Sequence, residues 1–221
     1  MVRVLLLGKD CLLRKGLLSI LAGVPDVEVV SGTDEDADAR RLMAEVQPDV
    51  VVLGWGMSLD QWVARVRRIR AEYPEVGVLV LTPRNRACYL AWAVRAGAAG
   101  MLTAEEAPEW LVEAVRRAAE GESFYTPEQM ERARVWWEEV GRRWESLSRR
   151  EREVVGAMVQ GRSNREIAAM LGVTEKTVEK HVTGVLGRLG AKSRAEAIRW
   201  VLESGVWEAE GGDKEVHAER F

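Results

Sequence analysis

Short apolar runs alternate with helical patterns along the first half of the chain, and this alternation most constrains the fold. The apolar runs occupy residues 2–7, 27–31, 50–53, 76–81 and 98–102. The helical patterns occupy residues 11–22, 34–46, 60–73, 84–96 and 106–120, with approximate ends. Five strand–helix units in this order predict an α/β doubly wound domain with a five-stranded parallel sheet. Near-continuous valine and leucine also fit strands that are covered on both faces.

One amphipathic helix is predicted to join this half to the rest of the chain. Thr126 is placed as its N-cap, and Pro127 as its first residue. Apolar residues then recur at alternating spacings of three and four, as in the seam of a coiled coil. The candidate dimer seam contains Met130, Trp137, Val140 and Trp144. Such a seam packs against the chain's own domains or against a second copy, and Trp136, which lies off it, favours a homodimer.

The last third of the chain is predicted to be entirely helical. The helical patterns occupy residues 149–160, 164–171, 175–189 and 194–204. The segment 208–221 is charged, and after its Gly211-Gly212 pair the stretch "DKEVHAERF" has no hydrophobic periodicity, so we expect this tail to be disordered. Residues 147–207 carry 11 basic and 7 acidic side chains, whereas the whole chain has a net charge of −3. This positive block indicates an anionic partner.

A helix-turn-helix pattern lies within the positive block, in "SNREIAAMLGVTEKTVEKHVTGVLGRLG". Gly172 is predicted to end its first helix in the left-handed conformation, and Thr174 to cap its second helix. The second helix of such a motif enters the major groove of DNA. The candidate DNA-binding residues are Asn164, Arg165, Thr174, Lys176, Thr177, Glu179, Lys180, His181, Thr183, Arg188 and Lys192.

The C-terminal block resembles the output domain of LuxR/NarL-type transcription regulators. The resemblance rests on "REREV", "SNREIA", "TEKTVEKHV" and "KSRAEAI" within about 50 continuous residues. It implies a four-helix DNA-binding domain over residues 147–207 whose third helix reads double-stranded DNA. Glu179 departs from the family, which usually has a basic residue there. A carboxylate repels phosphate, although it accepts a hydrogen bond from cytosine N4.

Residues 1–125 resemble the receiver domains of two-component response regulators. The resemblance is carried by "RVLLLGKDCLLRKGL", "QPDVVVL", "RRIRAEYPEVGVLVLT" and "AVRAGAAGMLTAEEAPEWLVEAVRRAAEGES". It implies a flavodoxin-like sheet with the strand order 2-1-3-4-5. The linker helix then spans residues 126–146, and the whole chain is similar to a NarL-type, FixJ-like response regulator.

The resemblance also shows that the chemical residues of a receiver are missing. Gly54 occupies the position of the aspartate that accepts the phosphoryl group, and Gly8-Lys9 the position of the acidic pair that holds Mg²⁺. Ala104 replaces the lysine, and Thr82 alone remains as the switch hydroxyl, with a second role as N-cap of the fourth helix. An acyl phosphate needs a carboxylate nucleophile, so we expect a degenerate receiver without aspartyl phosphorylation.

A crevice is expected to remain where the missing residues would lie, at the topological switch point of the sheet. Gly8 and Gly54 would face each other there, with Lys9, Asp10, Trp55 and Thr82 around them. The crevice is either filled by the protein's own side chains or open to a small ligand or anion. A protein partner at the receiver is a further alternative.

Other functional classes leave no trace in the sequence. Cys11 and Cys88 form neither a metal pattern nor a disulfide framework, and no nucleophile–base pair is visible. We therefore expect no metal, no cofactor and no enzymatic activity. No apolar run approaches the length of a membrane span, and the N-terminus lacks a secretory signal, which predicts a cytoplasmic protein.

These observations predict a transcription regulator that binds specific DNA sequences without aspartyl phosphorylation. The alternative is a protein-interaction or ligand-sensing pseudo-receiver whose DNA binding is weakened, as Glu179 would suggest.

Overall fold

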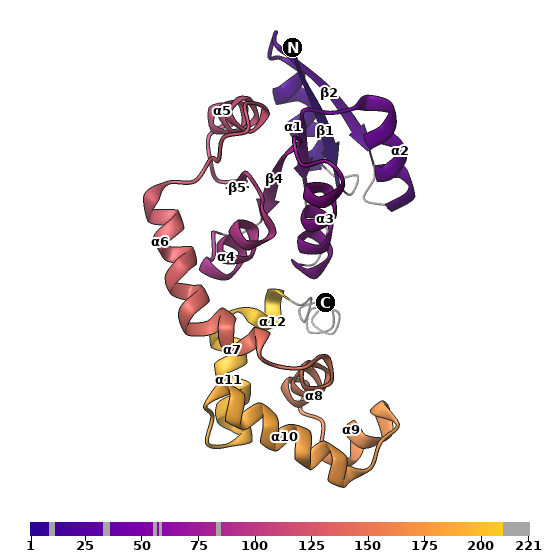
Figure 1. Cartoon of the computed structure of the whole chain (residues 1–221), viewed down its shortest axis with the longest axis vertical. Helices are drawn as coiled ribbons and strands as arrows, with labels where there is room; N and C mark the ends of the chain where they lie inside the picture. The colour runs from indigo at the N-terminus through magenta and orange to yellow at the C-terminus, as the bar shows by residue number, and fades with distance from the viewer. Residues whose placement is uncertain (9–11, 33–35, 55–56, 58, 83–84, 210–221) are drawn as a thin grey trace. The chain divides into compact units, whose positions relative to one another are not determined.

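The computed structural model describes residues 1–8, 12–32, 36–54, 57, 59–82 and 85–209. The chain divides into two compact units, Met1–Ala133 and Arg134–Phe221. The first unit contains a sheet with helices around it, and the described part of the second unit consists of helices (Figure 1).

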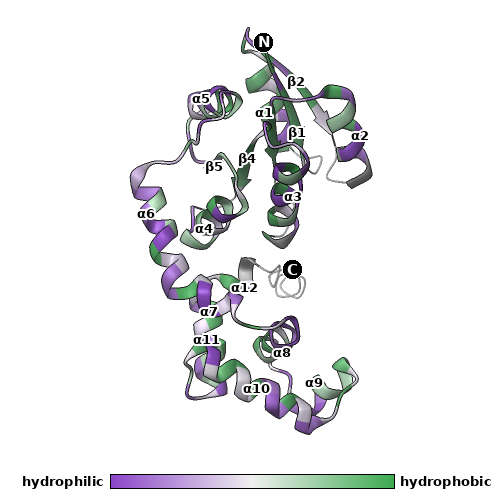
Figure 2. Ribbon diagram, viewed as in Figure 1, coloured by the Kyte–Doolittle hydropathy of each residue, from purple (hydrophilic) through white to green (hydrophobic). Residues whose placement is uncertain are grey.

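Five parallel strands form a single sheet in the first unit, which confirms the predicted doubly wound fold. The strand order is β2-β1-β3-β4-β5, as the receiver resemblance implies. The strands are β1 (Val2–Leu7), β2 (Val27–Gly32), β3 (Val50–Leu53), β4 (Gly77–Thr82) and β5 (Gly100–Thr103). All residues of β3, β4 and β5 are buried, and the strands are predominantly hydrophobic in Figure 2. Cover on both faces explains why their sequences do not alternate.

Helices cover both faces of the sheet. They are α1 (Leu12–Ala22), α2 (Asp36–Val46), α3 (Leu59–Glu72), α4 (Ala87–Ala96) and α5 (Pro108–Ala119). Leu17 of α1 and Leu111 of α5 join one buried cluster with Leu6 of β1. On the other face, Leu7 of β1 lies below α2 and α3, and α4 packs beside α3.

The predicted start of the fourth helix is wrong. Thr82 does not cap α4, because β4 continues through Thr82 and pairs it with Thr103 of β5. The helix begins only at Ala87, after an extended Arg86 whose side chain makes no capping hydrogen bond. Pairing in the sheet has therefore overridden the capping signal of Thr82-Pro83.

The helix after the receiver contains a π turn that the sequence analysis did not predict. Its parts are α6 (Pro127–Trp136), the π turn η1 (Trp137–Gly141) and α7 (Arg142–Glu145). Thr126 caps α6 as predicted, since its hydroxyl accepts a hydrogen bond from the Gln129 N–H at 3.1 Å. The indole of Trp137 lies where a side chain of Gly141 would be, 2.5 Å from an ideal Cβ. Gly141 thus lets the bulky indole fold back over the turn.

The single chain already buries the two tryptophans of the predicted dimer seam. Trp137 is 8% exposed and Trp144 is 2% exposed, whereas Val140 is half-buried and Met130 is 43% exposed. Trp136, taken as support for a dimer, is also buried, and its indole N–H donates to the Ser204 carbonyl oxygen at 3.1 Å. The burial and the hydrogen bond of Trp136 favour packing within the chain.

The four helices predicted in the second unit are all present. They are α8 (Arg149–Val159), α9 (Asn164–Leu171), α10 (Glu175–Leu189) and α11 (Arg194–Ser204). A short further helix, α12 (Val206–Ala209), was not predicted. It corrects the expected tail 208–221, because residues 208 and 209 are helical; residues 210–221 lie outside the described part.

Replacing Gly141 by alanine should destabilise the protein. The new Cβ would overlap the indole of Trp137, and overpacking of this kind costs about 1–3 kcal/mol. Gly187 is the matched control, because no atom lies within 4 Å of its ideal Cβ. Gly187→Ala should stabilise its helix by about 0.5–1 kcal/mol. Urea unfolding followed by circular dichroism measures both variants, and equal effects would contradict the packing of Trp137 on Gly141.

Candidate functional site

Two helices of the second unit, α9 and α10, form a helix-turn-helix. Gly172 ends α9 in the left-handed conformation with φ 64°, as predicted. Thr174 caps α10 by accepting a hydrogen bond from the Thr177 N–H at 3.2 Å, also as predicted. Ile167 of α9 and Val178 and Val185 of α10 are fully buried. This core fixes α10 by one face and leaves the other face to solvent.

The exposed face of α10 carries the polar side chains expected to meet DNA. Lys176, Glu179 and Lys180 are exposed near its N-terminus. Thr183 is exposed one turn later, and its hydroxyl donates to the Glu179 carbonyl oxygen at 3.0 Å. The remaining candidates on α10 are Thr177 and His181, which are half-buried, and Arg188, which is exposed. Lys176 and Lys180 lie one turn apart, so both cations lie on the same side of the helix.

The helix starts depend on serine–glutamate pairs that the sequence analysis missed. Ser163 is the N-cap of α9: its hydroxyl accepts a hydrogen bond from the Glu166 N–H at 3.3 Å. The Glu166 carboxylate accepts in return from the Ser163 N–H at 2.7 Å. Ser148 and Glu151 form the same capping box at α8. The pattern S-x-x-E, which recurs at Ser148, Ser163 and Ser193, was the available signal.

A buried carboxylate ties α8 to the second half of α10. Glu151 is 4% exposed and forms an ion pair with Arg188. An ideal Cβ on Gly184 would lie 2.4 Å from the Glu151 carboxylate, so the glycine makes room for it. Burial raises the pKa of the Glu151 carboxyl, but hydrogen bonds from Ser148 and the nearby Arg188 outweigh it and leave the pKa lowered. Arg188, predicted as a DNA contact, therefore also has a structural role.

Two further candidates take part in contacts around the start of α11. The side-chain oxygen of Asn164 accepts a hydrogen bond from Arg194 at 3.0 Å. The N–H of Lys192 donates to the Glu196 carboxylate at 2.8 Å, and the Lys192 side chain is exposed. Arg165 is also exposed, on the first turn of α9. Asn164 thus joins α9 to α11, while Arg165 and Lys192 present their charges to solvent.

In the first unit, β1 and β3 are neighbours and end side by side. The N–H of Gly54 donates to the carbonyl oxygen of Leu7 at 2.6 Å. An ideal Cβ on Gly54 would lie 3.8 Å from the Cα of Gly8, so the two glycines do lie together as expected. Thr82 is 2% exposed at the end of β4, and Ala104 is exposed in the turn after β5.

Part of the predicted crevice lies outside the described residues, namely Lys9, Asp10 and Trp55. Among the residues that are described, no group of three or more His, Cys, Asp or Glu side chains could hold a metal ion. None of the helices described is long and apolar enough to cross a membrane.

Both units match known families. Residues 4–116 match the family described as "Response regulator receiver domain". Residues 145–201 match "Bacterial regulatory proteins, luxR family". The chain therefore belongs to the response regulators, and its output domain is of the LuxR type. This family assignment defines a DNA-binding transcription regulator.

One similar protein and two solved structures match over most of the chain, and the two structures show the same fold. "Transcriptional regulatory protein DegU" of Brevibacillus brevis is 29% identical over 222 residues, covering 92% of this chain and 94% of its own. RcsB of Salmonella enterica serovar Typhimurium, solved bound to a promoter with a phosphomimetic, is 21% identical with TM-score 0.59. That match covers 92% of this chain and 98% of RcsB. A structure of two RcsB dimers on two parallel DNAs has TM-score 0.55, 22% identity and the same coverage.

Replacing Glu151 by glutamine should reveal the ion pair through its pH dependence. The folded state lowers the pKa of Glu151 below its ordinary value of 4.5. Its contribution is therefore complete above pH 4.5 and is lost as the pH falls through the folded pKa. At pH 7 the variant should lose about 1–3 kcal/mol of stability. The loss should shrink as the pH is lowered towards 3, in urea unfolding of the full chain.

A matched control for this prediction is Glu203→Gln, on the exposed side of α11. It removes the same charge from the same unit without touching Arg188. The free energy of unfolding lost in Glu151→Gln is the quantity to compare. If this loss stayed constant from pH 7 to pH 3, it would contradict the role of the ionised carboxylate.

Proposed function

We propose that this response regulator controls transcription by binding DNA as a homodimer, without aspartyl phosphorylation of its receiver. The proposed parts are a pseudo-receiver over residues 1–125, a linker helix over 126–146 and a DNA-binding domain over 147–207. The observation that carries the proposal is Gly54 at the end of β3, beside Gly8 at the end of β1.

The chemistry of the receiver supports this proposal. Glycine offers no carboxylate to attack a phosphodonor, so no acyl phosphate can form at Gly54. Mg²⁺ prefers carboxylate and phosphate oxygens, and Gly8 supplies none from a side chain. Ala104 lacks the ammonium group that would pair with a phosphoryl group. The fold does not need these groups, because its sheet is held by buried aliphatic side chains.

DNA binding by α10 is supported by its exposed face and by the LuxR-type family. A dimer is supported by analogy with the RcsB dimers on DNA and by the two-fold symmetry of many operator sites. The tryptophans of the linker do not supply the dimer contact in this proposal, since the chain already buries them. Met130, which is exposed on α6, stays a candidate.

The exposed carboxylate of Glu179 favours a second candidate function. An acidic side chain among the groove-facing residues weakens attraction to phosphate, and a helix that does not enter DNA is free to bind a protein. In that case the pseudo-receiver and the helical unit would act as interaction modules. A ligand in the crevice between β1 and β3 remains an alternative input for either function.

Treatment with acetyl phosphate and Mg²⁺ should leave the protein unchanged. Mass spectrometry should find no phosphoryl adduct, and light scattering should find the same mass with and without the phosphodonor. Gly54→Asp alone should fold but not restore phosphorylation, because Gly8 and Ala104 still lack the groups that hold Mg²⁺ and phosphate. An ideal Cβ at residue 54 lies 3.2 Å from the Leu7 carbonyl oxygen, so only a small shift is needed.

A stable adduct on the unaltered receiver, or assembly that depends on beryllofluoride, would overturn the proposal of phosphorylation independence. The melting temperature of Gly54→Asp serves as the check that the variant is folded.

Lys180→Ala should weaken binding to a duplex selected from a random library. Loss of a contact to a base costs about 1–3 kcal/mol and relaxes preference at one position. Glu179→Lys should instead raise non-specific affinity, because it adds a cation close to the phosphates. Fluorescence anisotropy at several salt concentrations measures both effects.

The matched control is Arg149→Ala, at the start of α8, whose side chain is 95% exposed. It removes the same charge from the same unit but not from α10. If neither Lys180→Ala nor Glu179→Lys changes retention on any duplex at low salt, α10 does not enter a groove and the protein-interaction function is preferred.

A further inference from the structure

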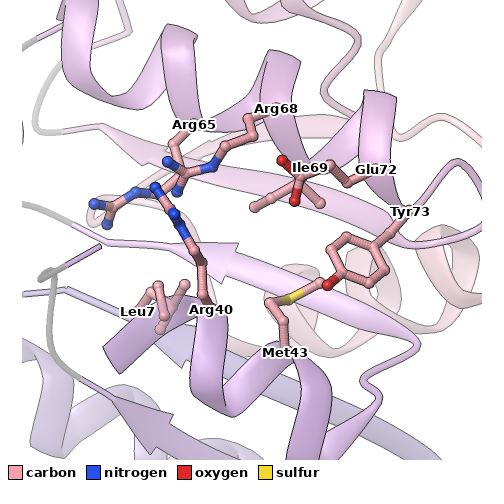
Figure 3. Close-up of a pocket in the computed structure, with 9 residues that line it drawn as sticks. Leu7, Arg40, Met43, Arg65, Arg68, Ile69, Glu72 and Tyr73 are labelled. Atoms are coloured by element: carbon pink, nitrogen blue, oxygen red, sulfur yellow. The ribbon is translucent and has the colours of Figure 1, made fainter. Parts of the chain in front are cut away.

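Several charged groups that the fold brings together already have partners within the protein. Arg65 and Arg68 line a small cavity of about 20 Å³ between α2 and α3 (Figure 3), and both interact with other groups of the protein. In the second unit, the buried Glu151 forms an ion pair with Arg188. Glu179 on α10 differs from these residues, and its surroundings indicate a role in reading DNA.

The carboxylate of Glu179 is exposed on the face of α10 that is expected to meet DNA. Within the described part of the chain, no side chain forms an ion pair or a hydrogen bond with this carboxylate. Glu179 lies beyond the first turn of α10, and only within that turn does a negative charge gain from the helix dipole. Neither a partner nor the end of the helix therefore accounts for an acidic side chain at this position.

The hydroxyl groups beside Glu179 are already hydrogen-bonded within the protein. The Thr183 hydroxyl donates to the Glu179 carbonyl oxygen at 3.0 Å, and the Thr177 hydroxyl oxygen lies 2.8 Å from that of the N-cap residue. Lys176 and Lys180 have ammonium groups, which donate hydrogen bonds but cannot accept them. The carboxylate of Glu179 only accepts, so it gives this face an acceptor that the described part of the chain leaves unused.

We propose that Glu179 is a specificity-determining residue, which selects a cytosine in the DNA site by accepting a hydrogen bond from its N4 amino group. The proposal rests on the proposed DNA-binding function, in which the N-terminal part of α10 approaches the base edges. In the major groove, only cytosine and adenine expose an amino group. Adenine also exposes the N7 acceptor beside its amino group, and this acceptor repels a carboxylate, so cytosine is preferred.

The lysines on either side of Glu179 fit the same base pair. Lys176 and Lys180 are exposed on the same side of the helix. The guanine that pairs with a cytosine exposes O6 and N7, which accept hydrogen bonds from lysine. A C·G pair thus offers a donor to the carboxylate and acceptors to an ammonium group. Because phosphates repel Glu179 in every sequence alike, its hydrogen bond should change base preference more than total affinity.

Selection of duplexes from a random library by the full chain tests this proposal, with Glu179→Ala and Glu179→Gln as variants. The unaltered protein should prefer cytosine at one position of each half-site. Glu179→Ala should lose this preference, by about tenfold or more in the affinity ratio between the cytosine duplex and its base variants. Glu179→Gln should prefer adenine there, because a glutamine amide binds adenine N6 and N7 together. Fluorescence anisotropy at one salt concentration measures the ratios.

Glu203→Gln is the matched control, because it removes the same charge from an exposed position of α11 in the same unit. It should keep every preference of the unaltered protein. Unchanged preferences in Glu179→Ala would overturn the proposal, and so would selection of a base other than cytosine at the position that responds to Glu179. If the unaltered protein retains no duplex at low salt, DNA binding itself is refuted, and the proposed role of Glu179 is refuted with it.

Discussion

The close approach of β1 and β3 is the constraint on which the receiver unit depends. Their backbones pair along the buried centre of the sheet and end together, where the Gly54 N–H reaches the Leu7 carbonyl oxygen at 2.6 Å. In an open α/β sheet this is the switch point at which ligands bind. In this chain the geometry is the same, although a glycine follows each strand, Gly8 after β1 and Gly54 after β3. The scaffold can persist because buried aliphatic contacts stabilise it independently of the side chains at its edge.

In the helical unit, apolar packing and polar side-chain pairs have separate roles. Its apolar core orients α10, but polar pairs set where each helix begins and how α8 meets α10. In the Glu151–Arg188 pair the carboxylate is buried and the guanidinium is partly exposed. Gly184 leaves the space that the carboxylate fills. A glycine within a helix costs stability, so its presence is explained by the buried group that it accommodates. The solvent-exposed face of α10 therefore carries charged and hydrogen-bonding side chains.

Much of the fold was predictable because it depends on local patterns. The aliphatic runs placed all five strands to within about two residues, and Gly172 and Thr174 marked the turn between α9 and α10. The errors arose where one particular contact prevailed over the local sequence pattern. Pairing with Thr103 kept Thr82 in a strand, and the indole of Trp137 against Gly141 accompanied a π turn that the spacing of apolar residues did not predict.

By itself the sequence determined which elements form and which chemical groups are absent, because periodicity, caps and side-chain identity are properties of the chain. Gly54 has no carboxylate in any fold. Only the tertiary structure decided which groups meet: Trp136 with Ser204, and Glu151 with Arg188. These contacts join residues far apart in sequence, and packing brings such residues together in ways that local spacing does not encode.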